Sequence, residues 1–218
     1  MNLGTVCFRL EIPMFCVNTA ADKLIAGATL VCLSPLLGII FLAIKLEGLF
    51  YPTARGPAIW AMTRITKGEH FGLFKFRTFR AHRHPDNYDG PETPYTDEQT
   101  NPDTTRVGRF LLKWYLDELP QLFNILRGEM RLVGPRPVPP WYYAKELSVG
   151  ADAKQRVKAG WAGLAQASKG PRSSGYKSRR LDALYVRRVA NMSSWQRLRY
   201  DLRVTLRTLQ TMLQGGGL

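Results

Sequence analysis

The chain has 218 residues, enough for one domain with a hydrophobic core and an appended segment. Hydrophobic residues make up 45% of the sequence, which excludes a largely disordered protein. The 31 basic and 17 acidic side chains give a formal net charge of +14. This excess indicates a polyanionic partner: nucleic acid, an anionic lipid surface or a phosphorylated substrate. The cysteines, Cys7, Cys16 and Cys32, have neither disulfide-framework nor zinc-site spacing, as expected in a reducing compartment.

A membrane segment is predicted over residues 22–50, after an N-terminal segment of residues 1–21. Residues 24–44 carry no charge, and a run of 21 residues is long enough to cross the hydrocarbon of a bilayer. Ser34 and Pro35 lie in its middle, where proline removes a helical hydrogen bond and predicts a kink. Two arrangements follow: a kinked helix that spans the bilayer, or a re-entrant helix that leaves on the side it entered. Basic residues lie on both sides of this run, so the N-terminal side has no strong tendency to be moved across the membrane.

Residues 51–218 are expected to form one body at the membrane surface. Leu46, Leu49, Phe50, Tyr51 and Trp60 mix apolar and aromatic side chains, as at a lipid headgroup layer. Residues 71–79 alternate in polarity and predict a strand or extended segment that carries Lys75 and Arg77 on one side. Residues 81–102 are rich in proline and acids and predict a mobile loop. Its mobility argues against a metal site formed there by His82 and His84.

The stretch from Tyr115 to Pro137 is predicted to hold the chemistry. Because Pro120 fits only the first turn of a helix, we expect a helix from about Asp117 to Gly128. Its start places the carboxylates of Asp117 and Glu118 near unpaired N–H groups, a location that also attracts phosphate and its cation. The Pro-rich turn that follows would hold the Arg136 guanidinium ready for two-pronged phosphate binding. The same residues also fit a capped helix and a turn with no chemical role.

A final amphipathic helix is indicated by apolar residues at spacings of three and four from Trp195 to Leu213. Ser193 and Gln196 predict a capping box at its start, and Gly215 predicts its end. Arginines lie on its polar sides. They fit a solvated face and contact with anionic lipid headgroups equally well.

A longer pattern resembles the bacterial sugar transferase family, the small monotopic phosphoglycosyl transferases that begin membrane-linked glycan assembly. The resemblance covers about Asp22 to Thr208. Its motifs are Lys75-Phe76-Arg77, Leu116-Asp117-Glu118-Leu119-Pro120-Gln121-Leu122, Asn124, Leu126, Gly128, Met130, Gly134-Pro135-Arg136-Pro137, Gly160 and Gly163-Leu164-Ala165-Gln166.

The resemblance implies an α-rich α+β fold with a re-entrant membrane helix kinked at Ser34-Pro35, interfacial amphipathic helices and a small catalytic domain with little β-structure. That domain would lie on the cytoplasmic face of the bacterial inner membrane, with the oligomeric state open between monomer and homodimer.

The implied reaction transfers a phospho-sugar from a UDP-sugar to polyprenyl (undecaprenyl) phosphate and releases UMP. Asp117 would be the nucleophile and a Mg²⁺ ligand, and Glu118 would hold the metal, position the acceptor or take a proton. Lys75, Arg77, Arg136 and Gln166 would bind substrate phosphates or other parts of the substrate.

Several positions depart from the family pattern. Leu112 stands where arginine is usual, Tyr115 where serine is usual, Ala159 where proline is usual and Ala162 where threonine is usual. These departures leave two alternatives in view: a non-catalytic membrane-surface scaffold of the same family, and a membrane-anchored nucleic-acid-binding protein. The second is disfavoured because no nucleic-acid motif is found and lipid and phosphate account for the charge.

Overall fold

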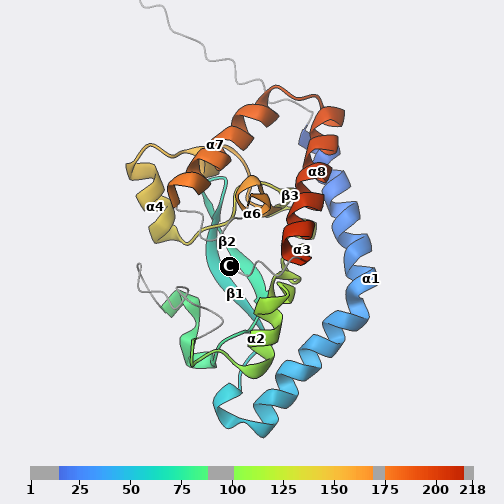
Figure 1. Cartoon of the computed structure of the whole chain (residues 1–218), viewed down its shortest axis with the longest axis vertical. Helices are drawn as coiled ribbons and strands as arrows, with labels where there is room; N and C mark the ends of the chain where they lie inside the picture. Colours follow the sequence, from blue (N-terminus) through green and yellow to red (C-terminus); the bar gives the residue numbers. More distant parts are fainter. Residues whose placement is uncertain (1–14, 88–100, 169–174, 214–218) are drawn as a thin grey trace, which may run out of the picture.

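The computed structural model describes residues 15–87, 101–168 and 175–213, and the chain is mostly helical with little sheet (Figure 1). This confirms the α-rich prediction. The helices are α1 (Phe15–Phe50), α2 (Arg106–Lys113), α3 (Gln121–Arg127), α4 (Pro140–Ser148), α5 (Ala153–Arg156), α6 (Leu164–Ala167), α7 (Gly175–Ala190) and α8 (Ser194–Leu213). The strands are β1 (Ile59–Thr66), β2 (Glu69–Phe76), β3 (Arg131–Val133) and β4 (Gly160–Ala162). Short 3₁₀ turns cover Pro52–Ala54, Ala81–Arg83, Pro85–Asn87 and Leu116–Glu118.

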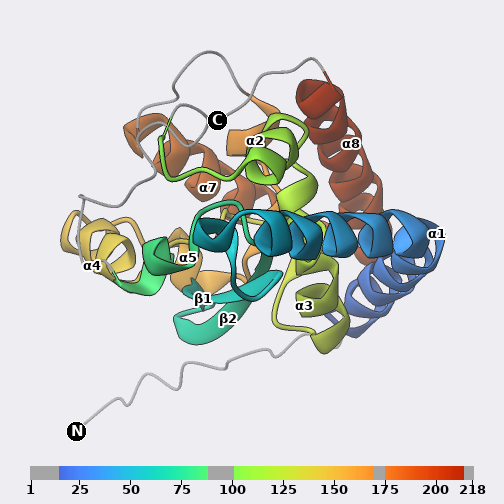
Figure 2. The same ribbon diagram turned by 90° about the horizontal axis from the view of Figure 1, so that it is seen from below.

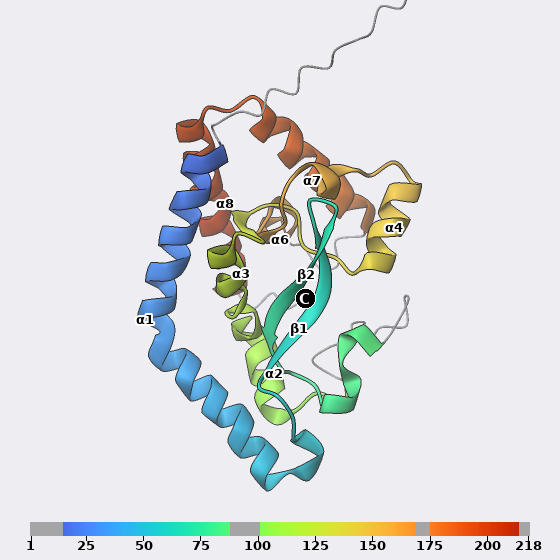
Figure 3. The same cartoon turned by 180° about the vertical axis from the view of Figure 1, so that it is seen from behind.

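The long helix α1 runs along one side of the molecule and changes direction part-way along its length (Figures 1 and 3). It contains Pro35 yet is one continuous helix, so the predicted helix–break–helix is corrected to a single bent helix. The Ser34 hydroxyl donates to the Val31 carbonyl at 2.8 Å, a local bond that commonly accompanies helix bending. The stretch Thr19–Phe50 is long and apolar enough to cross a membrane.

Two acidic side chains attach α1 to the body, one towards each end of its apolar stretch. Asp22 is buried and pairs with the Arg131 guanidinium on β3. Glu47, 25 residues later, accepts hydrogen bonds at 2.6 Å from the backbone N–H of Arg106 and at 3.4 Å from that of Val107, at the start of α2. A carboxylate at a helix N-terminus satisfies amides that lack an intrahelical partner. Both attachments therefore join α1 to the same folded body.

Between the attachments, α1 presents an inner face to the core and an outer face without cover. Ala26, Leu30, Ile40 and Ile44 are buried against the body. The outer face consists of exposed apolar side chains, among them Leu24, Val31, Ile39, Phe41, Leu42 and Leu46. An uncovered apolar stripe of this length indicates contact with lipid rather than with water.

The antiparallel β1–β2 hairpin lies at the centre, with α4 on one side and α8 on the other (Figures 1 and 2). Its turn uses Lys67 and Gly68, both with positive φ. The expected strand at 71–79 is confirmed as far as Phe76. Trp60 is in β1 and 5% exposed in the core, so its predicted place at the lipid interface is wrong. The predicted loop 81–102 lies largely outside the described residues.

The loop after β3 is positioned by a close backbone approach. Strands β3 and β4 are parallel, with Arg131 opposite Gly160 and Val133 opposite Ala162. A Cβ atom on Gly160 would lie 1.9 Å from the Gly134 nitrogen, so glycine is required for this approach. The pairing fixes the start of the Gly134–Pro137 turn, which carries Arg136.

Candidate active site

The two central carboxylates lie in a tight turn that precedes α3. Tyr115 has a left-handed backbone (φ 55°), and the 3₁₀ turn Leu116–Glu118 follows it directly. The α-helix itself starts at Gln121, four residues later than the predicted start near Asp117. Its end at Gly128, in a left-handed conformation with φ 76°, is confirmed.

The carboxylates of Asp117 and Glu118 lie where three segments meet: their own 3₁₀ turn, β2 and the turn after β3. Lys75 from β2 places its ammonium 2.9 Å from Asp117 Oδ2 and 3.2 Å from Glu118 Oε1. Arg136, from the turn after β3, donates to Glu118 Oε1 at 3.1 Å. The carboxylates are buried at 3% and 2% exposure. We call Lys75, Asp117, Glu118 and Arg136 the carboxylate cluster. The sequence predicts Asp117 as the nucleophile and Lys75 and Arg136 as phosphate ligands. It predicts that Glu118 holds the metal, positions the acceptor or takes a proton.

The pKa values of the two acids of the cluster are shifted in opposite directions. Burial raises the pKa of Asp117, the neighbouring Glu118 charge adds to the rise, and Lys75 offsets it only in part. Burial would also raise the pKa of Glu118, but Lys75 and Arg136 together outweigh it and lower that pKa to about 2. Glu118 contacts two cations and Asp117 one, which explains the direction of the difference. Asp117 is thus the more basic and more nucleophilic carboxylate.

Asn124 on α3 aligns the cluster, a role that the sequence pattern alone did not predict. Its side chain is fully buried, donates to the Gly72 carbonyl at 2.7 Å and accepts from the Phe74 N–H at 3.0 Å. It also donates to Glu129 at 2.7 Å. These bonds join α3 to β2 and so hold Lys75 against the carboxylates. A buried amide whose hydrogen bonds are all made is rigid. The sequence offered one sign of this role, because Asn124 is part of the family motif.

Arg77 does not join the cluster, although the sequence predicted it to face phosphates beside Lys75. It lies just past the end of β2, so the alternation of the strand no longer fixes its direction. Its guanidinium is 1% exposed and donates to the carbonyls of Pro57, Phe79 and Ala54 at 2.6–3.0 Å. Arg77 therefore holds the backbone of the connections around the hairpin.

The sequence pattern of the bacterial sugar transferase family matches residues 14–215 of the chain. The chain belongs to this family. It is 35% identical over 196 residues to a UDP-glucose:undecaprenyl-phosphate glucose-1-phosphate transferase from Caulobacter vibrioides, covering 87% of this chain and 67% of that protein. It is 40% identical over 153 residues to an undecaprenyl-phosphate glucose phosphotransferase from Komagataeibacter xylinus, covering 67% of this chain and 27% of that protein. An Escherichia coli UDP-glucose:undecaprenyl-phosphate glucose-1-phosphate transferase is 35% identical over 76% of this chain and 35% of its own length.

The chain thus spans only about a quarter to two thirds of the length of these relatives. The family match shows that the cluster residues Asp117, Glu118 and Arg136 lie within the region that the family shares.

The departures from the family pattern are buried in this member of the family. Leu112, at the position where the family usually has arginine, packs into the core on α2 at 8% exposure. Ala159 and Ala162 are also buried, beside and within β4. The cationic side chains that contact the carboxylates in the described residues are Lys75 and Arg136.

Gln166 on α6 lies close to the glycine turns but outside the carboxylate cluster. It is 8% exposed, and neither its amide nitrogen nor its amide oxygen has a hydrogen-bond partner among the described residues. A Cβ atom on Gly163 would lie 2.6 Å from Gln166 Oε1 and 2.4 Å from the Gly134 carbonyl, so Gln166 sits near the base of the Arg136 turn. A buried amide without partners costs stability, and such a cost is typical of a group kept for a ligand.

Replacing Gln166 with leucine is therefore expected to move stability and activity in opposite directions. The apolar side chain of similar size removes unsatisfied polar atoms, so the unfolding free energy should rise by about 1–3 kcal/mol. Turnover should fall if the amide binds substrate. Chemical unfolding and UMP release are the two measurements, with exposed Gln155→Leu as the control. A variant that is less stable yet fully active would contradict the expectation.

Proposed function

We propose that this chain transfers a sugar phosphate from a UDP-sugar to undecaprenyl phosphate, giving undecaprenyl-diphosphate-sugar and UMP. The family membership and the functions for which the relatives are named support this reaction class. The observation that carries the proposal is the carboxylate cluster: a basic carboxylate, a second carboxylate and two cations on one buried site. Such a set provides a nucleophile together with phosphate ligands.

In the proposed mechanism, an Asp117 oxygen attacks the sugar-proximal phosphorus of the donor. The bond from that phosphorus to the bridging oxygen breaks, UMP leaves with the electron pair, and the sugar phosphate remains on Asp117 as an acyl phosphate. An oxygen of the polyprenyl phosphate then attacks the same phosphorus and returns Asp117 to its carboxylate form. No general base is required for the first step because Asp117 attacks as a carboxylate.

Lys75 and Arg136 have two successive partners in this mechanism. In the structure they cover the acids, with Asp117 only 3% exposed. Donor phosphates compete for the same cations, since both side chains bind phosphate oxygens readily. When a donor is present, the side chains of Lys75 and Arg136 would leave the carboxylates for its phosphates. Asp117 would then become accessible to the donor. Glu118 remains a candidate to hold metal, position the acceptor or take a proton.

Mg²⁺ is the proposed cofactor, and the acids of the cluster fit it. Magnesium is commonly held by one or two carboxylates together with substrate phosphates rather than by an all-protein cage. Asp117, with Glu118 beside it, provides carboxylate oxygens of the right kind. Within the described ranges no group of three or more His, Cys, Asp or Glu side chains is placed to hold a metal. The ion, when bound, would reduce repulsion between the carboxylate and the diphosphate.

The membrane arrangement proposed here is a re-entrant α1, with the body on the cytoplasmic face of the inner membrane. Its support is the pair of attachments at Asp22 and Glu47, which bind both ends of the apolar stretch to one body. A helix that spanned the bilayer would put these attachments on opposite sides. The bend in α1 and its exposed apolar outer face agree with a helix that dips into one leaflet (Figure 3).

Site-specific labelling tests the arrangement. In a cysteine-free background, Ala20→Cys and Thr53→Cys place exposed thiols near the two ends of the apolar stretch, and Glu69→Cys marks the body. All three should react with a membrane-impermeant maleimide from the same side of sealed vesicles. Ile39→Cys, exposed on the outer face, should stay unlabelled from both sides. Labelling of positions 20 and 53 from opposite sides would establish a spanning helix instead.

UMP release from a panel of UDP-sugars tests the activity itself. Release is expected only with a matching UDP-sugar, Mg²⁺ and undecaprenyl phosphate present in detergent or nanodiscs. Failure with every donor, together with normal membrane binding, would favour a non-catalytic scaffold. Tight, salt-sensitive binding of DNA or RNA without UMP release would favour the nucleic-acid alternative.

A further inference from the structure

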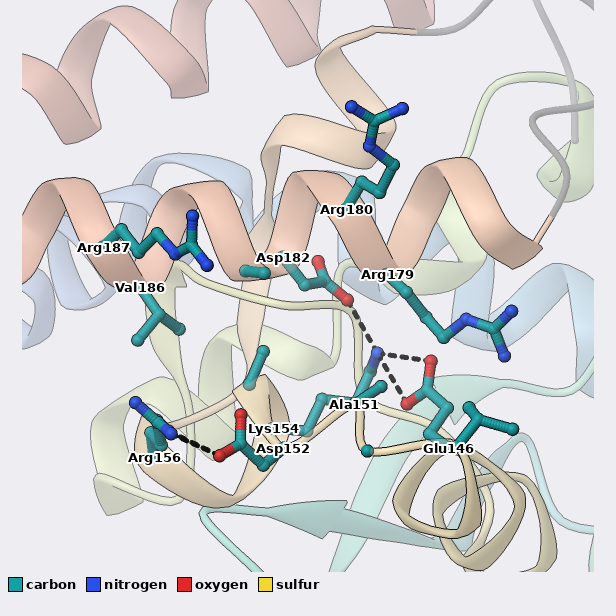
Figure 4. A pocket seen from close by; sticks show the side chains of 14 residues that line it. Glu146, Ala151, Asp152, Lys154, Arg156, Arg179, Arg180, Asp182, Val186 and Arg187 are labelled. Atoms are coloured by element: carbon teal, nitrogen blue, oxygen red, sulfur yellow. Dashed lines mark hydrogen bonds and ion pairs between the residues drawn. The ribbon is translucent and has the colours of Figure 1, made fainter.

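A second concave site lies outside the carboxylate cluster, among α4, α5 and α7 (Figure 4). The cavity has a volume of about 450 Å³, within the range of small-molecule sites. Its walls come from the end of α4, the connection to α5, α5 itself and one face of α7. None of the four cluster residues lines it.

A buried ion network forms the floor of this cavity and fixes its shape. Lys154 on α5 is 5% exposed, 2.9 Å from Glu146 Oε2 on α4 and 2.7 Å from Asp182 Oδ2 on α7. Burial would lower the pKa of Lys154, but Asp182 and Glu146 outweigh it and raise that pKa, so the lysine stays charged. One cation thus joins three helices, and the cavity exists before any ligand arrives.

Arginines surround the cavity above this floor. Arg156 and Arg187 lie at the same end, with Val186 between them (Figure 4). Arg156 donates to Oδ2 of the half-buried Asp152, from Nε at 2.8 Å and from Nη2 at 2.5 Å. For Arg187 and for Arg179 at the far end, no acidic side chain of the described residues lies within ion-pair distance. The acids of the lining are therefore occupied by Lys154 and Arg156, and the rim keeps an excess of positive charge.

The chemistry of this rim suits a phosphate group. A planar guanidinium group binds phosphate oxygens with two parallel hydrogen bonds. Two guanidinium groups at the same end of a cavity can bind one phosphate together. Ala153, Ala183 and Val186 provide an apolar wall beside them for the rest of a ligand. The net negative charge of the floor, two carboxylates against one ammonium, keeps an anion at the rim and away from Lys154.

We propose that this cavity is a second anion site, in which Arg156 and Arg187 bind the phosphate of a phosphate ester. Two sources share this chemistry: the headgroup of an anionic phospholipid and a soluble ester such as glycerol 3-phosphate. An ordinary solvated basic face would be convex and adaptable, whereas these arginines flank a cavity that is held open by an ion network.

The test compares two double variants of the full chain that each remove two positive charges. Arg156→Ala/Arg187→Ala alters the proposed site, and Arg203→Ala/Arg207→Ala removes exposed cations from α8. Binding of glycerol 3-phosphate is measured by calorimetry in nonionic detergent. Binding to phosphatidylglycerol and phosphatidylcholine vesicles is measured by sedimentation. Circular dichroism checks that both proteins are folded, and Arg187→Glu alone serves as a second variant of the site.

A soluble ligand predicts that the cavity variant loses at least about tenfold in glycerol 3-phosphate affinity while the α8 variant does not. A lipid ligand predicts weak binding of glycerol 3-phosphate by all proteins, with a loss of phosphatidylglycerol-vesicle binding at least about tenfold larger for the cavity variant than for the α8 variant. Equal behaviour of the two double variants in both assays would overturn the proposal.

Discussion

Asp117→Asn is expected to reduce UMP release by about 10³-fold or more, because removal of a covalent nucleophile leaves only binding and positioning. Protein incubated with a donor labelled in the sugar-proximal phosphate should carry label in the wild type and none in the variant. Both measurements are needed, since UMP release alone does not distinguish a covalent step from direct transfer.

The same substitution is expected to leave the fold intact or stabilise it, and this separates chemistry from folding. The pKa of Asp117 is higher in the folded protein than its ordinary value of 3.8. Ionisation of such a group lowers the stability of the folded protein as the pH rises from 3.8 through the folded-state pKa. At neutral pH, ionised Asp117 therefore costs stability, and a neutral asparagine avoids the cost. Lys75 keeps Glu118 as a partner at 3.2 Å. Chemical unfolding is the measurement, and exposed Glu69→Gln is the control.

Normal turnover by Asp117→Asn would show that Asp117 is not the nucleophile while leaving the family membership untouched. Inactivity combined with a large loss of unfolding free energy would indicate a structural role for the carboxylate instead. Labelled Asp117→Asn protein would place the covalent attachment on another residue.

Features that depend on local spacing were predictable from the sequence. The apolar spacing of α8 and the capping box at its start are confirmed, since the Ser193 N–H donates to Gln196 at 3.0 Å and the Gln196 N–H to Ser193 at 3.3 Å. Gly128 ends α3 as expected. The predicted end of α8 at Gly215 lies outside the described residues.

Features that depend on contacts between distant segments were not predictable from spacing. Asn124 bonds to Gly72, 52 residues earlier, and Asp22 pairs with Arg131, 109 residues later. Arg77 illustrates the limit of a local pattern. It shares a motif with Lys75, yet its position past the end of β2 sends its guanidinium to backbone carbonyls. Trp60 illustrates another, because an aromatic residue near a membrane segment suits an interface and a core equally well.

Asp22→Asn is expected to lower the unfolding free energy by about 3 kcal/mol, since it leaves the Arg131 guanidinium without its carboxylate in the core. Arg131 is 3% exposed, and its Nη2 atom already lacks a hydrogen-bond partner in the described parts of the chain. Asp201, also buried nearby, compensates for only part of the loss through its charge. The expected effect lies at the lower end of those known for broken buried pairs because of this second acid.

Two further variants show whether the loss of stability in Asp22→Asn comes from the broken attachment of α1. Glu47→Gln, at the other end, weakens a carboxylate–amide contact at the start of α2 and should cost about 1 kcal/mol or less. Asp22→Leu/Arg131→Met removes both charges together and should recover most of the stability lost by Asp22→Asn. Urea unfolding in detergent measures all of these variants. If Asp22→Asn unfolds at the wild-type urea concentration, the N-terminal attachment is not formed. The N-terminal end of α1 would then be free to lie on the other side of the membrane, against the re-entrant arrangement proposed above.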